Sequence, residues 1–96
     1  MADYVEAKDV RSPREWWTLI DVLIDKGEDN YAVAIGEWEG VRRLAMRWNG
    51  NAEKPSGHPQ SRGNPMWFML PKDYDAAMVE TLPENKQIIA KALLGI

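Results

Sequence analysis

Three consecutive segments of the chain fit together as an antiparallel β-meander, and this pattern constrains the fold more than any other feature. The segments are residues 18–25, 30–38 and 41–48. When they are paired across short turns, large apolar side chains from all three fall into common rows on one face. A slip of one residue would break every row, because successive side chains of a strand point to opposite faces.

The turns predict a register for the three strands. The two-residue turn Glu39-Gly40 places Trp38 opposite Val41. The pairs that follow are Ile35 with Leu44, Val33 with Met46, Tyr31 with Trp48, and an ion pair of Glu37 with Arg42. The four-residue loop 26–29 predicts a second set of pairs: Ile24 with Tyr31, Val22 with Val33, and Ile20 with Ile35.

The beginning of the first strand is open to a second interpretation. Residues 12–15 (SPRE) have the composition of a helix capping box with proline at the first helical position. A helix over residues 13–26 would have one polar face and would end at Gly27. The β-branched residues at every second position, and the match with the next strand, favour a helical turn at 13–17 followed by a strand.

The remainder of the chain predicts one more strand and two helices. Residues 66–70 (MWFML) are apolar throughout, which is typical of a strand covered on both faces. A helix is expected over 72–82, and a last helix follows a second capping box at 81–84 and ends at Gly95. The expected buried stripe of the last helix is Ile88, Ile89, Ala92 and Leu93.

These elements predict a small α+β protein with a four-stranded, mainly antiparallel β-meander, followed by two C-terminal helices that cover one face. Residues 12–96 are expected to form a single α+β domain. Residues 1–11 are expected to be a polar N-terminal lead-in that is mobile unless a partner holds it.

Composition excludes several classes of protein. The chain has no cysteine, which excludes disulfides, thiolate catalysis and thiolate metal sites and is compatible with a cytoplasmic location. No run of 18 apolar residues is present, so no membrane partner is expected, and the acidic N-terminus is unlike a signal peptide. The net charge is −3, yet residues 40–65 contain five cationic side chains against Glu53 alone. This basic segment allows a local anionic partner.

The face of the meander opposite the apolar rows carries small residues in the middle and arginines along one side. Its members on the second and third strands are Ala32, Ala34, Gly36, Arg43, Ala45 and Arg47. One interpretation is that a helix packs on the small residues and the arginines are solvated. The other is a platform for a flat or anionic ligand, or for a second subunit.

Residues 49–65 form a long irregular segment rich in glycine and proline, a type of loop that is either functional or disordered. It presents Arg62 and the single histidine, His58. Trp48 and Trp67 are expected in the core, whereas Trp16, Trp17 and Trp38 are expected to be exposed. The candidate ligand-binding residues are therefore Arg43, Arg47, His58, Arg62 and Trp38.

No pattern for catalysis, metal binding or a cofactor is present in the sequence. His58 has no second histidine with which to form a metal site, and no nucleophile elbow surrounds Ser56 or Ser61. No glycine-rich phosphate loop precedes a helix. We therefore expect no catalytic residues, no metal and no cofactor.

Two resemblances add to this interpretation. Residues 36–40 (GEWEG), 44–50 (LAMRWNG) and 59–71 (PQSRGNPMWFMLP) resemble small uncharacterised proteins carried by mobile elements, such as integron gene-cassette proteins. This likeness extends over about residues 12–96 and implies no site residues. The order of strands followed by helix is also similar to the single-stranded-DNA-binding transcriptional coactivators and, distantly, to Whirly proteins, which implies a homodimer that binds DNA across a curved sheet.

The sequence thus favours a non-catalytic binding protein that forms a homodimer. Its expected ligand is single-stranded nucleic acid or another anionic molecule. A homodimeric protein-interaction or regulatory module without nucleic acid is the first alternative, and a small enzyme of unknown reaction is the second.

Overall fold

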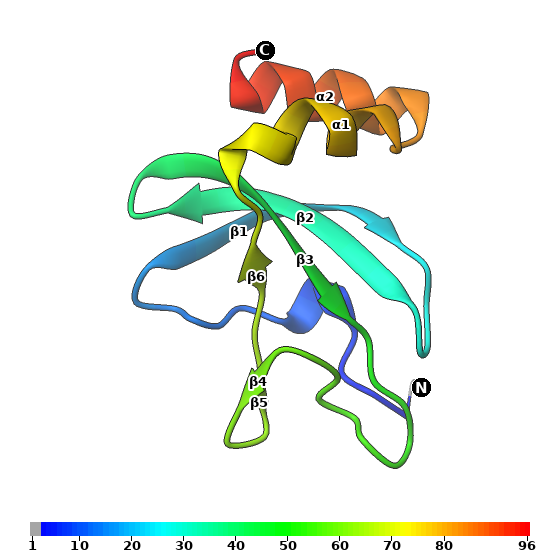
Figure 1. Cartoon of the computed structure of the whole chain (residues 1–96). Coiled ribbons are helices and arrows are strands. Elements are labelled where there is room, and N and C mark those ends of the chain that lie inside the picture. Colours follow the sequence, from blue (N-terminus) through cyan, green and yellow to red (C-terminus); the bar gives the residue numbers. More distant parts are fainter. Residues whose placement is uncertain (1–2) are drawn as a thin grey trace.

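The computed structural model describes residues 3–96 and shows a sheet between a helical layer and the N-terminal segment (Figure 1). The elements in chain order are η1 Ala7–Asp9, β1 Trp17–Asp25, β2 Tyr31–Trp38, β3 Val41–Trp48, β4 Gln60–Ser61, β5 Asn64–Pro65, β6 Phe68–Met69, η2 Lys72–Tyr74, α1 Asp75–Glu80 and α2 Glu84–Leu94. The main sheet has the order β1-β2-β3-β6, and β4 and β5 form a small hairpin. The expected α+β fold, with a meander before two C-terminal helices, is confirmed.

The register of β2 with β3 is the predicted one. Trp38 pairs with Val41, Ile35 with Leu44, and Tyr31 with Trp48. Glu39 and Gly40 both have positive φ, at 51° and 84°, as a type I′ turn requires. The expected ion pair also forms, with Arg42 Nε 3.1 Å from Glu37 Oε2.

The register of β1 with β2 differs from the predicted one, although residues 17–25 are a strand as expected. Two β-bulges leave Ile20 and Leu23 without partners and pair Asp21 with Ile35 and Ile24 with Val33. The bulges let the neighbouring residues Leu23 and Ile24 enter the same apolar cluster, which strict alternation forbids. Ile20, expected in an apolar row, is exposed instead.

The helices cover the apolar face of the sheet, where Val33, Ile35 and Leu44 are fully buried. The other buried members of this cluster are Leu23, Leu70, Val79, Leu82 and Ala90. Two polar contacts hold α2 to the sheet: Lys86 Nζ lies 3.1 Å from Asp21 Oδ2, and Arg42 Nη1 donates to the Leu93 carbonyl oxygen at 3.2 Å.

Two details of α2 differ from expectation. The predicted buried stripe is wrong in part: Leu93 packs against the core as expected, but Ala90 is the buried residue of the helix, while Ile88, Ile89 and Ala92 are exposed. The predicted capping box does not form either: Pro83 is the N-cap, and the Thr81 hydroxyl donates to the Met78 carbonyl oxygen. Gly95 does end the helix in the left-handed conformation, as expected.

The N-terminal segment covers the other face of the sheet, so of the two interpretations given for this face the open platform is wrong. Ala32, Ala34 and Ala45 are fully buried beneath Ala7, Val10 and the rings of Trp17 and Trp67. The Trp67 indole N–H donates to the Val10 carbonyl oxygen at 2.7 Å, and the Val5 amide donates to Pro55. The N-terminal lead-in expected over residues 1–11 thus contributes two buried side chains, Ala7 and Val10, where small side chains on both sides allow close packing, whereas Lys8 and Asp9 are exposed.

Within residues 3–96, no helix has both the length and the apolar character needed to cross a membrane.

Candidate ligand-binding groove

The helices leave one end of the apolar face uncovered. The chain leaves β6 towards the helices at Leu70, whose amide donates to Leu44, so the helical layer lies over the Leu44 end of β3. At the other end of β3, Trp48 is 53% exposed, and on β6 Phe68 is 56% exposed. The Tyr31 ring meets Trp48 edge-on, with ring centroids 6.1 Å apart.

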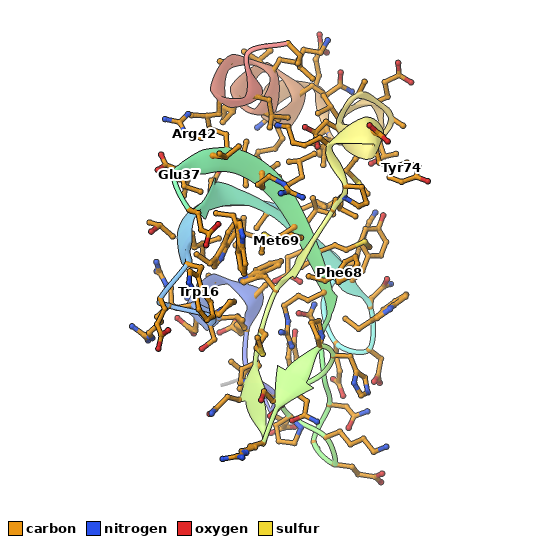
Figure 2. All side chains as sticks on the ribbon, turned by 60° about the vertical axis from the view of Figure 1, so that its left-hand side comes forward. Trp16, Glu37, Arg42, Phe68, Met69 and Tyr74 are labelled. Carbon is orange, nitrogen blue, oxygen red and sulfur yellow. The ribbon has the colours of Figure 1, made fainter. Side chains whose placement is uncertain are left out.

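A groove of about 520 Å³ runs between these exposed rings, and we name it the aromatic groove. It is lined by Met46, Arg47, Trp48, His58, Pro59, Gln60 and Phe68. Pairing of Phe68 with Met46 fixes one wall, and Figure 2 shows Phe68 and Met69 on opposite sides of β6. Mutual backbone hydrogen bonds between Trp48 and His58, at 2.7 and 3.0 Å, fix the other wall. One wall of the groove is therefore fixed by strand pairing, and the other by an isolated β-bridge from the loop to β3.

Arg47 is the most unusual residue of the groove, because its charged side chain is only 1% exposed. The guanidinium donates to the carbonyl oxygens of Met66, at 2.5 Å, and Ser56. Within residues 3–96 no carboxylate pairs with it, and its buried Nε has no hydrogen-bond partner. Burial lowers the pKa of Arg47 by desolvation, yet an arginine begins so high that it keeps its charge at neutral pH.

The loop over residues 49–65 is held by specific hydrogen bonds. The Asn49 side chain donates to Asp25 Oδ1 and to the Gly27 carbonyl oxygen, both at 2.8 Å. Asn51 Oδ1 accepts from the amides of Glu53 and Lys54. The loop therefore has a defined conformation and supports the His58 wall of the groove.

A second hollow adjoins the groove at Trp48 and His58. Lys54 and Asp29 are the charged residues that line it. The charges next to the aromatic groove are thus Arg47, Lys54 and Asp29, a positive balance in an acidic protein.

The structure brings together only some of the predicted site residues. Arg47 and His58 both line the aromatic groove. Arg43 is half-buried and donates to the Leu70 carbonyl oxygen at 2.8 Å. Arg62 is exposed at the tip of the β4–β5 hairpin, and Trp38 is half-buried against Trp16, with ring centroids 6.1 Å apart. A ligand-binding role for each of these residues stays a prediction.

The two exposed rings of the groove were not predicted. Trp48 was expected in the core and is exposed, whereas Trp17 was expected at the surface and is buried; Trp67 is buried as predicted. One signal in the sequence could have predicted the exposure of Trp48. If the fourth strand runs antiparallel to β3, the helices that follow it begin at the Leu44 end of β3. The Trp48 end is then left uncovered.

The described residues contain no cluster of three or more histidines, aspartates or glutamates that could hold a metal ion. No protein-family model matches the chain, and no curated protein or solved structure shows significant similarity to it.

Proposed function

We propose that this protein is a non-catalytic binding protein, and that its aromatic groove holds an aromatic ligand that carries negative charge. Single-stranded nucleic acid is the first candidate. The observation that carries the proposal is the pair of exposed rings, Trp48 and Phe68, on neighbouring strands at the uncovered end of the sheet. Proteins that bind single strands stack bases on such rings, with about 1–3 kcal/mol for each base.

The charge next to the groove supports an anionic ligand. Arg47 supplies a positive charge that no carboxylate within residues 3–96 pairs with, and Lys54 lines the adjoining hollow. The whole chain is acidic, so attraction of nucleic acid by net charge is absent. Stacking therefore supplies most of the affinity, and binding should weaken only gently with salt because few phosphates are neutralised.

Loss of either ring should weaken binding of a short oligothymidylate. We expect Trp48→Ala and Phe68→Ala each to raise the Kd about 5- to 100-fold, the equivalent of one lost stacking contact. The measurement is fluorescence anisotropy of the labelled oligonucleotide at low and moderate salt.

Tyr74→Ala is the matched control, because Tyr74 is an exposed aromatic residue outside the groove. It should leave the Kd within about 2-fold of the parent. Absence of binding at low salt, or equal losses in all three variants, would contradict the proposal.

A second candidate function is that of an interaction module that forms a homodimer through α2. The outer face of α2 exposes Ile88, which is 67% exposed, and Ile89. In an antiparallel pair of α2 helices with Ile88 on the twofold axis, Glu84 of one copy would lie near Lys91 of the other, so the face is complementary to itself. A second copy of this chain is therefore the partner that we propose for it.

This candidate predicts that Ile88→Glu converts a dimer into a monomer in sedimentation equilibrium. The substitution places two carboxylates together on the twofold axis, where like charges repel. Asn85→Glu is the contrasting variant: it adds the same charge one turn from the axis, where it faces Lys91 of the other copy, and it should leave the dimer intact. A parent protein that remains monomeric at high concentration would refute this candidate and leave the groove proposal unaffected.

A further inference from the structure

Another hollow, remote from the aromatic groove and from the hollow beside it, lies between the turn at residues 13–16 and the β4–β5 hairpin. Its volume is about 330 Å³, and we name it the arginine hollow. The side chains that matter for its chemistry are Arg14, Glu15, Trp16, Ser61, Arg62 and Asn64. Figure 2 shows Trp16 and Phe68 on opposite sides of the molecule, so a ligand here does not occupy the groove.

The hollow has two arginines that the rest of the described chain does not use. Arg14 and Arg62 are exposed, and within residues 3–96 neither side chain makes an ion pair or a hydrogen bond. Glu15 is the one carboxylate among the lining residues. In contrast, Arg42, Arg43 and Arg47 all donate to carbonyl oxygens of this chain. The two free guanidiniums therefore leave the hollow positive.

Arg62 occupies a position that does not favour arginine. Arg62 and Gly63 are the two central residues of the hairpin, with φ of 52° and 82°, as in a type I′ turn. Asparagine, aspartate or glycine fits such a position best, because other side chains are strained there. Strained backbone of this kind clusters at functional sites, which favours a role for the Arg62 charge at this tip.

The tip that carries Arg62 is held firmly. The Gly63 amide donates to Gln60 Oε1 at 2.6 Å, and the Ser56 hydroxyl donates to the Gly63 carbonyl oxygen. These bonds join the hairpin to the loop before it, so Arg62 extends from a fixed backbone. Because the backbone is fixed, anion binding here has to order the Arg62 side chain but not the hairpin that carries it.

Trp16 supplies a flat wall. It is 49% exposed, and its ring is backed by Trp38 at a centroid distance of 6.1 Å. The Trp16 amide donates to the Pro13 carbonyl oxygen, which fixes the turn that presents the ring. A planar organic group can lie against this exposed ring.

We infer that the arginine hollow binds a phosphate group between Arg14 and Arg62, with the planar organic part of the phosphate ester against Trp16. Guanidinium groups recognise phosphate through paired, charge-assisted hydrogen bonds, which suits two free arginines in one hollow. This inference does not depend on the function proposed for the aromatic groove.

The test uses the full chain with Trp48→Phe, so that the fluorescence of Trp16 dominates among exposed tryptophans. The probes are inorganic phosphate and phenyl phosphate at constant ionic strength. We expect both to bind, with phenyl phosphate about 3- to 10-fold tighter because its ring contacts Trp16. Arg62→Asn should weaken binding of both about 5- to 20-fold, and its thermal midpoint should not fall because asparagine suits positive φ.

Three further variants separate a real site from general charge effects. Glu15→Gln should tighten phosphate binding about 2- to 5-fold by removing the neighbouring negative charge. Trp16→Ala, which removes the fluorescent reporter and is therefore measured by isothermal titration calorimetry alongside the parent, should abolish the advantage of phenyl phosphate. Arg11→Asn, which removes an equal charge from an exposed arginine outside the hollow, should change the Kd by less than 2-fold.

A thymidine dinucleotide with and without a 5′-phosphate then identifies the source of the phosphate. Tighter binding of the phosphorylated form supports a terminal phosphate ester, and equal binding supports the phosphodiester of a strand. The inference is overturned if neither phosphate nor phenyl phosphate binds, or if Arg62→Asn and Arg11→Asn weaken binding equally.

Discussion

Replacement of Arg47 by alanine should lower the free energy of unfolding by about 3–4 kcal/mol. The side chain is buried and joins β3 to the long loop through the Ser56 carbonyl oxygen and to the segment after it through the Met66 carbonyl oxygen. Alanine removes the donor from both partly buried carbonyl oxygens, at about 1–3 kcal/mol each, and it opens a cavity. Relief from burial of an unpaired charge offsets part of this loss.

Two further substitutions separate hydrogen bonding from charge. Arg47→Lys keeps the charge, but its single, strongly hydrated ammonium group does not have the fork that serves two carbonyl oxygens. We expect it to lose about 2–3 kcal/mol, close to alanine. Arg47→Met keeps most of the side-chain volume and removes the charge. It should be the least destabilising of the three variants if desolvation of the buried charge lowers the stability of the parent.

Urea denaturation followed by far-UV circular dichroism measures all three variants. Arg62→Lys is the control, since Arg62 is exposed and makes no hydrogen bond within residues 3–96; it should lie within about 0.5 kcal/mol of the parent. An Arg47→Lys protein as stable as the parent would show that the two carbonyl contacts contribute nothing.

The parts of the fold that could be predicted are those that short-range chemistry determines. The Glu39-Gly40 turn fixed the pairing of β2 with β3 because a type I′ hairpin leaves no freedom in register. Gly95 marked the end of α2 because glycine adopts the left-handed conformation without strain. In both places the local sequence and the final structure agree.

The parts that could not be predicted depend on residues far apart in the chain. The β1 bulges bring Leu23 and Ile24 into one cluster, and they set Asp21 beside Lys86, a residue 65 positions away. The burial of Arg47 depends on carbonyl oxygens of a loop whose course no pattern reveals. No pattern in the sequence predicts that an arginine on a strand is buried.

The aromatic groove could not be predicted either, because it too depends on residues far apart in the chain. Exposure of Trp48 is decided by where the helices lie over the sheet, which is a property of the whole chain. His58 and Arg47 were among the predicted candidates and line one groove, and their role in ligand binding stays a prediction. The exposure of its two aromatic walls, on which the proposed function depends, is seen only in the structure.

Gly36→Ala should lower the free energy of unfolding by about 2–3 kcal/mol. Alanine in place of glycine within a strand ordinarily stabilises a protein by about 0.4–1 kcal/mol, because the unfolded chain loses freedom. At Gly36 an added methyl carbon would lie 2.6 Å from Cη2 of Trp17 and would also collide with the Thr18 carbonyl oxygen. The Trp17 ring is buried among the alanines of the sheet and cannot move aside without a loss of packing.

Trp17→Phe identifies which contact is responsible, because phenylalanine lacks the outer ring that contains Cη2. If the ring is the obstacle, Gly36→Ala in the Trp17→Phe background should cost about 1 kcal/mol less than it does in the parent, a coupling that a double-mutant cycle from urea denaturation measures. Strict additivity would assign the cost to the Thr18 backbone instead. A Gly36→Ala protein as stable as the parent would contradict the close packing of the Trp17 ring and β1 against Gly36, and with it the seal of this face of the sheet.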